Sequence, residues 1–216
     1  MKDIPVFPTE YGVASLFLKE IPYSGHAYIQ IQDAPAETTP QLLTECVGFC
    51  KACGAERFFY SGGPREEEPT FTVLKMSGCA RVDPKQLAHL FPVTEQTVAQ
   101  WRKIYNERMA TVPHSRTLSF GDEQEIVRNV GAYFVHRDGN LLGIGWLEDT
   151  HLLAVASVVK GAGEQVMHTL MSLVEGSQRT LEVSSQNEKA LALYRRLGFL
   201  TTGISKQWYE FCEDDK

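Results

Sequence analysis

The chain has 216 residues, of which 43% are hydrophobic and 22% are charged, and its formal net charge is −6. These values are typical of a globular protein with one large domain or two small ones. The acidic balance argues against a large nucleic-acid-binding surface, which needs clustered positive charge, and it would attract a cationic partner such as an amine.

The sequence contains no apolar run of the roughly 20 residues that a membrane-spanning helix needs. The N-terminal residues, MKDIPVFPTEYG, have no apolar core of the kind found in signal peptides. Five cysteines are an odd number, which fits a reducing compartment. We therefore expect a cytoplasmic protein without a membrane partner.

The N-terminal part of the chain alternates strands with one helix. Gly54 would end that helix, and a charged loop rich in glycine and proline follows the next strand, from Gly62 to Pro69. Its pattern predicts strands at 12–18, 26–32, 56–61 and 70–76, with a helix at 40–53.

Three cysteines of the predicted helix, Cys46, Cys50 and Cys53, lie at i, i+4 and i+7. This spacing would place their thiols on one face, where they could bind a metal or pack in the core. Free cysteine is commonly buried, and the spacing is not that of a zinc finger or ribbon. The pattern therefore favours three core residues and no metal site.

The C-terminal part begins after a proline-punctuated junction at 81–92. Asp138-Gly139 between two apolar runs is a strong hairpin signal. The long apolar run after the hairpin is typical of a central strand. The pattern predicts helices at 94–109, 119–128 and 164–175, and strands at 131–137, 141–148, 150–159 and 205–211.

The most informative stretch is 179–199, RTLEVSSQNEKALALYRRLGF. Leu181 and Val183 alternate with polar residues as in a strand, and a polar turn follows. The next apolar residues recur at helical spacing up to Leu197, and Gly198 ends the helix.

This stretch resembles the C-terminal motif of the GCN5-related N-acetyltransferase (GNAT) superfamily, which reads roughly L-x-V-x-x-x-N-x-x-A-x-x-L-Y-x-x-L-G-F. The resemblance implies an α/β (α+β) GNAT fold, a mixed central β-sheet flanked by helices. It covers about residues 85–212 well and residues 1–80 poorly. We expect 85–212 to form the acetyltransferase domain and 1–80 to form an N-terminal half-GNAT-like unit without a phosphate-binding loop.

A glycine-rich turn lies between the strand at 150–159 and the next helix. Glycines let a backbone approach a ligand closely, and the first amides of a helix are unpaired beside the positive end of its dipole. Such a turn can hold a pyrophosphate. It resembles the GNAT acetyl-CoA signature [Q/R]-x-x-G-x-[G/A], with Lys160 first, Gly163 in the centre and Gln165 where the family prefers glycine or alanine.

The resemblance implies that acetyl-CoA is the cosubstrate and that no metal is needed. Its pantetheine arm would run along one strand end, and Asn187 would hold it from the other side. A backbone amide near Val155 would polarise the thioester carbonyl. The strand-end residues would be Val155, Ala156 and Ser157, and the pyrophosphate would bind the amides of Lys160, Gly161, Ala162, Gly163, Glu164 and Gln165.

Direct attack of an amine on a thioester needs a base for the amine's proton and an acid near the leaving sulfur. Tyr194 resembles the general acid of the family. Glu182 is the preferred base, because it lies twelve residues before the tyrosine, as in ribosomal-protein alanine acetyltransferases of the superfamily. An ion pair or a solvated strand position is the alternative for Glu182. Other possible bases at neighbouring strand ends are His136, His151, Glu148 and Asp149.

The sequence therefore predicts an acyltransferase that moves an acetyl group to a primary amine, either of a small molecule or of a protein N-terminus. The departure at Gln165 keeps open a second hypothesis, a CoA-binding or regulatory module with weak catalysis. A monomer and a homodimer are both compatible with the sequence.

Overall fold

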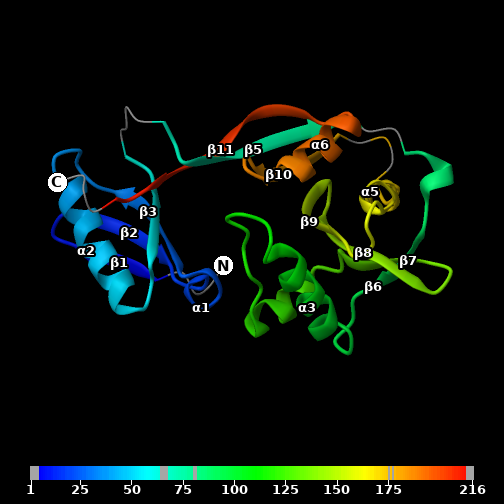
Figure 1. Cartoon of the computed structure of the whole chain (residues 1–216), viewed down its shortest axis with the longest axis horizontal. Helices are drawn as coiled ribbons and strands as arrows, with labels where there is room; N and C mark the ends of the chain where they lie inside the picture. Colours follow the sequence, from blue (N-terminus) through cyan, green and yellow to red (C-terminus); the bar gives the residue numbers. More distant parts are fainter. Residues whose placement is uncertain (1–4, 64–67, 80–81, 175, 177, 213–216) are drawn as a thin grey trace. The chain divides into compact units, whose positions relative to one another are not determined.

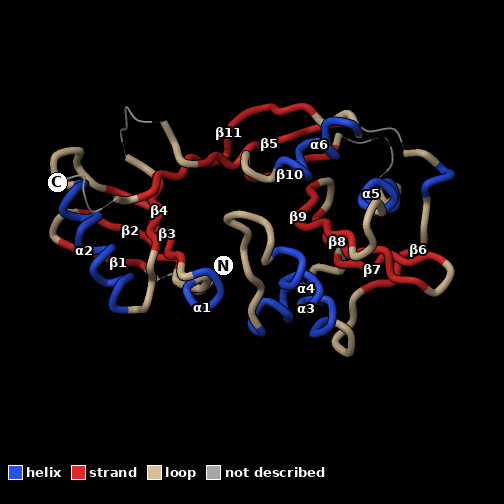
Figure 2. Tube along the Cα trace, in the orientation of Figure 1, coloured by secondary structure: helices blue, strands red, loops and turns tan. Residues whose placement is uncertain are grey.

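The computed structural model describes residues 5–63, 68–79, 82–174, 176 and 178–212. The chain forms two compact units, which Figures 1 and 2 trace. Unit 1 comprises Met1–Thr72 and Lys206–Lys216, and unit 2 comprises Val73–Ser205. Two strands, β5 (Phe71–Gly78) and β11 (Leu200–Glu210), continue from one unit into the other.

Unit 1 is a sheet in the order β1-β2-β3-β4-β11, with helix α2 (Thr39–Ala52) on one face. β3 and β4 are parallel, and the other neighbours are antiparallel. A short helix, α1 (Ile21–Ser24), precedes β3. The strands are β1 (Val6–Thr9), β2 (Gly12–Phe17), β3 (His26–Asp33) and β4 (Arg57–Ser61).

The apolar side of α2 forms the core of unit 1. Leu42, Cys46 and Cys50 are fully buried there, and burial raises the pKa of the Cys46 thiol to about 11. The prediction of three core cysteines is wrong for Cys53, which follows the last helical residue and is exposed. Among the described residues, no group of three or more histidine, cysteine or acidic side chains could hold a metal.

Unit 2 is a mixed sheet in the order β11-β5-β10-β9-β8-β7-β6. β9 and β10 are parallel, and β10 pairs antiparallel with β5 on its other side. The strands are β6 (His89–Pro92), β7 (Ala132–Arg137), β8 (Asn140–Glu148), β9 (His151–Ser157) and β10 (Arg179–Ser184). The helices are α3 (Val98–Met109), α4 (Glu123–Arg128), α5 (Gly163–Met171) and α6 (Glu188–Arg196), with short 3₁₀ turns η1 (Pro84–Gln86) and η2 (Phe120–Asp122).

Helices cover the sheet of unit 2 on both faces. α5 and α6 form a core with side chains such as Val135 and Leu147, and α3 and α4 form a second core with their strand neighbours Phe134 and Trp146. Because successive strand residues point to opposite faces, the two cores lie on opposite sides of the sheet. No helix among the described residues is long and apolar enough to span a membrane.

Local turn chemistry explains the elements that the sequence predicted well. Asp138 and Gly139 both have positive φ, 51° and 77°, as a two-residue type I′ hairpin requires. The Asn187 side chain accepts a hydrogen bond from the Ala190 amide at 3.2 Å and caps α6. Gly198, at φ +84°, ends this helix, as predicted.

Several predicted segments differ from the structure, among them the following three. The junction at 81–92 contains the edge strand β6, which the sequence analysis missed because its partner β7 lies about 40 residues away. β11 begins at Leu200 and not at 205. α5 ends at Met171, residues 172–174 form turns, and residue 175 of the predicted helix lies outside the described residues.

The contact between α5 and β8 depends on a glycine in the strand. A Cβ atom at Gly145 would lie 2.2 Å from Leu170 Cδ1, so the fully buried Leu170 side chain would have to shift within the packed core. We expect Gly145→Ala to lower the free energy of unfolding by about 1–3 kcal/mol through overpacking. Chemical denaturation measures this change.

The matched control is Gly203→Ala in β11, where no atom lies within 4 Å of the added Cβ. It should leave stability unchanged or raise it slightly. Equal stability of the Gly145 variant and wild type would contradict the tight contact between helix and strand.

Candidate active site

The parallel strands β9 and β10 separate shortly after they begin. They pair only at Thr180↔His151 and Leu181↔Leu152. Beyond Leu152, no described strand pairs with this edge of β9, and we call this unpaired stretch between the ends of the two strands the opening. In open α/β sheets, ligands bind in such crevices at the carboxyl ends of strands.

Unit 1 contains a similar strand–helix–strand arrangement, but its parallel strands stay together. β3 and β4 pair over five positions, from His26↔Arg57 to Gln30↔Ser61. The turn after β3 has no glycine between residues 34 and 38. The opening between parallel strands is therefore a feature of unit 2.

The backbone of β9 presents polar groups to the opening. The Val158 amide donates to Leu142 O on β8 at 2.8 Å, and residues of an antiparallel pair alternate in direction. The amides of Ala156 and Ala154 therefore face β8, and those of Val155 and Ser157 face the opening. A register shift makes Leu153 an extra residue of β9, a β-bulge at the point where the strands part.

The turn between β9 and α5 supplies further free amides. The amides of Gly161, Gly163 and Glu164 donate to no carbonyl among the described residues. Gly161 has φ +87°, and a Cβ at Gly163 would lie 3.3 Å from Leu193 Cδ2 on α6. The first glycine shapes the turn and the second lets α5 and α6 pack closely, so several amides point outward at the positive end of the α5 dipole.

Charged side chains surround this turn. Lys160 is exposed on the turn itself. Glu164 lies in the first turn of α5, with Arg196 Nη2 at 3.6 Å from one carboxylate oxygen and His168 Nε2 at 3.9 Å from the other. The positive charge of Arg196 thus offsets the negative charge of Glu164, which lies at a place where an anion could bind.

The structure places Tyr194 on α6, against the core that α5 and α6 share. Its ring centroid lies 6.0 Å from that of Phe199, and no described residue forms a hydrogen bond with its hydroxyl. Burial raises the pKa of Tyr194 to about 12. A tyrosine phenol is protonated at neutral pH even at its ordinary pKa of about 10, and the higher pKa of Tyr194 makes it a weaker acid.

Glu182 lies on the opposite face of β10 from Tyr194, because its neighbours Leu181 and Val183 point into the α5–α6 core. Its side chain is exposed and accepts a hydrogen bond from Ser205 Oγ at 2.5 Å. β5 lies between β10 and β11, so the carboxylate extends across β5, away from β9. The two proposed catalytic side chains are therefore not in contact.

The other residues considered as bases are spread around the same sheet. His151 Nδ1 shares a hydrogen bond with Thr180 Oγ1 at 2.8 Å, at the closed end of the opening. Glu148 is exposed at the end of β8 and Asp149 in the turn that follows. The His136 ring lies 5.5 Å from that of His89. Of these, His151 lies nearest in sequence to the parting of β9 and β10.

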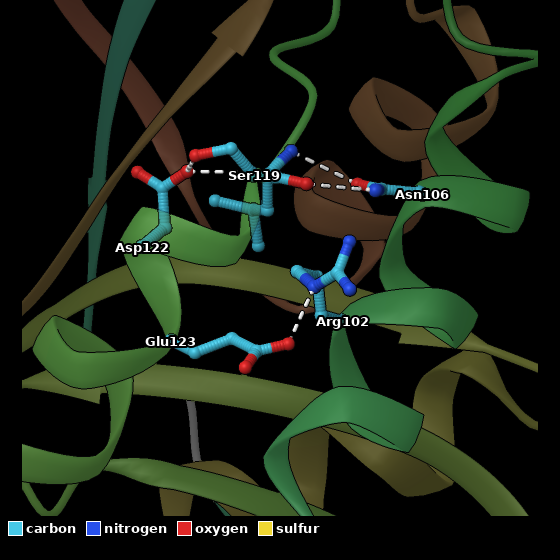
Figure 3. A network of polar contacts seen from close by, with 6 residues as sticks. Arg102, Asn106, Ser119, Asp122 and Glu123 are labelled. Atoms are coloured by element: carbon cyan, nitrogen blue, oxygen red, sulfur yellow. Dashed lines mark hydrogen bonds and ion pairs between the residues drawn. The ribbon is translucent and has the colours of Figure 1, made fainter.

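A polar network fixes the helical layer on the Glu182 face of the sheet (Figure 3). Asn106 on α3 binds both backbone groups of Leu118, each at 2.9 Å. The Arg102–Glu123 ion pair, at 2.7 Å, joins α3 to α4. Asp122 accepts from the Ser119 backbone amide and hydroxyl. These contacts hold the segment between the helices in one conformation.

Sequence reasoning missed three features of this site. The bulge at Leu153 has no sequence signal, because it depends on the register with β8. Ser205, the partner of Glu182, lies 23 residues away on another strand. Arg108 on α3 reaches the turn after β9 from a helix whose sequence carried no motif.

Comparison with known proteins gives three findings. No protein-family model matches the chain. The chain is 36% identical over 50 residues to N-alpha-acetyltransferase RimI of Mycobacterium tuberculosis, a match that spans 23% of this chain and 32% of that protein. The chain therefore covers about a third of the length of this curated relative.

Two solved structures share the fold at low sequence identity. A GCN5-related N-acetyltransferase from Anabaena variabilis has a TM-score of 0.61 at 11% identity, over 92% of this chain and 58% of that one. A tandem GNAT protein from the clavulanic acid biosynthesis pathway has a TM-score of 0.52 at 11% identity, over 93% and 78%.

The raised pKa of Tyr194 predicts a specific pH dependence. The folded-state pKa lies above the ordinary value of 10, so the stabilisation is complete below pH 10 and is lost as pH rises toward 12. We expect the free energy of unfolding to fall more steeply above pH 10 in wild type than in Tyr194→Phe.

Absorbance titration of the folded protein supplies the second measurement. Tyr194→Phe should remove one tyrosinate signal near pH 12, and the exposed-site control Tyr23→Phe should leave that signal intact. Loss of a signal near pH 10 in Tyr194→Phe would contradict the buried phenol.

Proposed function

Because the chain has the fold of the GCN5-related N-acetyltransferases, we propose that it transfers an acetyl group from acetyl-CoA to a primary amine. One observation carries the proposal: the opening between β9 and β10 is lined by outward backbone groups and ends at a turn with unpaired amides. An amide-containing chain with a phosphate end would satisfy both sets of groups.

The described residues fit such a cosubstrate. The outward amides and carbonyls of Val155 and Ser157 can pair with the two amides of a pantetheine arm, as a third strand would. The turn at Gly161–Glu164 offers amides at the start of α5 to a pyrophosphate. Asn187 uses its side-chain oxygen as the α6 cap, which leaves its NH₂ group for a ligand.

The backbone near the bulge supports an oxyanion site. The Val155 amide faces the opening and has no partner strand there. A donor that is fixed before the reaction stabilises charge that develops on a thioester oxygen when an amine attacks. The bulge at Leu153 sets the direction of the amides next to it.

The two polar side chains suit opposite sides of the reaction. The amine must lose a proton, and Glu182 on the exposed face of β10 is the proposed acceptor of that proton. For this role its carboxylate must leave Ser205 Oγ and turn toward β9. The thiolate must gain one, and Tyr194 on the other face is the proposed donor. Attack from one face and departure toward the other face would pass through the opening between the strands.

Binding of acetyl-CoA is the first test. A ligand that binds only the folded state stabilises it by about 2.7 kcal/mol at one hundred times its dissociation constant. We expect millimolar acetyl-CoA to raise the thermal midpoint of wild type clearly. Lys160→Glu should reduce this shift, because it reverses an exposed charge on the turn without loss of packing.

The matched control is Lys189→Glu, which makes the same charge change at an exposed position of α6. It should keep the wild-type shift. If acetyl-CoA does not shift the wild-type midpoint at all, the proposed function is wrong.

Catalysis is tested on a panel of small amines and N-terminal peptides. We expect Tyr194→Phe and Glu182→Gln each to lower kcat by about 10²–10⁴-fold, the usual contribution of an acid or base. Glu188→Gln, an exposed change in the first turn of α6, should keep wild-type kcat. Equal rates in all four proteins would remove both side chains from the mechanism.

A CoA-binding module with weak catalysis is the second candidate, because Gln165 stands where the family signature has glycine or alanine. Acetyl-CoA binding without turnover on any amine would favour this candidate.

A further inference from the structure

Arg108 on α3 lies beside the glycine-containing turn but belongs to the other helical layer. Its Nη2 donates to Val158 O at 2.8 Å, and Val158 is the first residue after β9. The side chain is exposed, and its remaining N–H groups make no hydrogen bond or ion pair with the described residues. A guanidinium has five donors, so most of them remain available.

The position of this guanidinium is unusual for an acidic chain. The net charge is −6, yet cations from three elements surround one turn. Arg108 comes from α3, Lys160 from the turn and Arg196 from α6, where it faces Glu164 at 3.6 Å. The free amides of the turn complete an environment that favours an anion.

We propose that Arg108, held at the end of β9 by its hydrogen bond to Val158 O, binds a phosphate group of acetyl-CoA. This assignment rests on the proposed function and adds to it a residue outside the signature turn. A planar guanidinium can hold two phosphate oxygens at once, which the ammonium of Lys160 cannot do. Arg108 thus supplies the contact to two phosphate oxygens that Lys160, in the turn, cannot make.

A purely structural contact would have different consequences. If Arg108 only ties α3 to Val158, its loss affects every thioester substrate equally, because the whole turn shifts. If Arg108 binds phosphate, its loss affects only substrates that carry phosphate. Substrates with and without phosphate therefore separate the two roles.

The experiment measures dissociation constants of acetyl-CoA, acetyl-3′-dephospho-CoA and S-acetylpantetheine for wild type, Arg108→Ala and Arg108→Lys. We expect Arg108→Ala to weaken acetyl-CoA binding by about 10- to 100-fold, the range of hydrogen bonds to charged groups. Arg108→Lys should be intermediate, and S-acetylpantetheine should bind all three proteins equally. The salt dependence of acetyl-CoA binding should also decrease in Arg108→Ala.

The comparison of acetyl-CoA with acetyl-3′-dephospho-CoA identifies which phosphate Arg108 contacts. A loss that disappears with acetyl-3′-dephospho-CoA assigns Arg108 to the 3′-phosphate, and a loss that persists assigns it to the pyrophosphate. Lys103→Ala is the matched control, since it removes an exposed charge from the same helix, where Lys103 pairs only loosely with Glu107 at 3.9 Å. It should bind acetyl-CoA as wild type does.

Three results would overturn the assignment: equal weakening of all three ligands in Arg108→Ala, the same weakening in Lys103→Ala, or unchanged acetyl-CoA binding in Arg108→Ala. In the last case wild type still binds acetyl-CoA, so the proposed function stands and only the role of Arg108 is lost. Failure of wild type to bind acetyl-CoA would instead overturn the function itself, and the role of Arg108 with it. Thermal midpoints of the free proteins show that each variant is folded.

Discussion

The site depends on the parting of β9 and β10 after two paired positions. Parallel strands normally stay paired, because a backbone group that loses water without gaining a partner costs free energy. In unit 1 this pairing continues over five positions and leaves no opening between β3 and β4. In unit 2 the strands diverge, so the backbone groups at the edge of β9 must find water or a ligand. In the proposed function, a ligand with amides takes the place of the missing strand.

Helix α5 is fixed along its whole length, which keeps the opening in place. Near its start, Gly163 faces Leu193 on α6, and Gly145 of β8 leaves space for Leu170. At the end of α5, two carbonyl groups accept hydrogen bonds from the buried Arg179: Met171 O, at 2.8 Å, and Val174 O. Burial lowers the pKa of Arg179, but a cation at this position also meets the negative end of the helix dipole. The turn before α5 is therefore held by a rigid support.

The segment before β6 adds a contact on the outer side of α5. The Ala88 amide donates to Thr169 Oγ1 at 3.0 Å, and the Asp83 amide donates to His168 Nδ1 at 3.3 Å. Both helix residues are buried polar groups that gain a partner in this way. The same His168 ring faces Glu164 at the glycine-containing turn, so the packing of a distant segment and the position of the turn are linked.

Features set by residues close together in sequence could be predicted, and features set by distant pairing could not. The hairpin at Asp138-Gly139, the Asn187 cap and the end of α6 at Gly198 depend on the conformations that these residue types favour. The strand β6 and the bulge at Leu153 depend on partners far along the chain.

Likewise, the motif at 179–199 identified the strand–turn–helix that carries Glu182 and Tyr194, but not the hydrogen bond from Ser205 that draws the carboxylate across β5. The period-two pattern of β10 already implied that Glu182 faces away from its apolar neighbours, but the assignment of Tyr194 to the other face required the packing of α6.

The separation of these two side chains has a physical advantage for the proposed reaction. Tyr194 packs against Phe199, and burial raises the pKa of its phenol to about 12. Glu182, on the other face of β10, is exposed and accepts a hydrogen bond from Ser205 Oγ. If both groups shared one small cavity, the low dielectric that raises the pKa of the phenol would also disfavour the carboxylate charge. Strand β10 keeps the two environments apart, because the two side chains lie on opposite faces of the sheet.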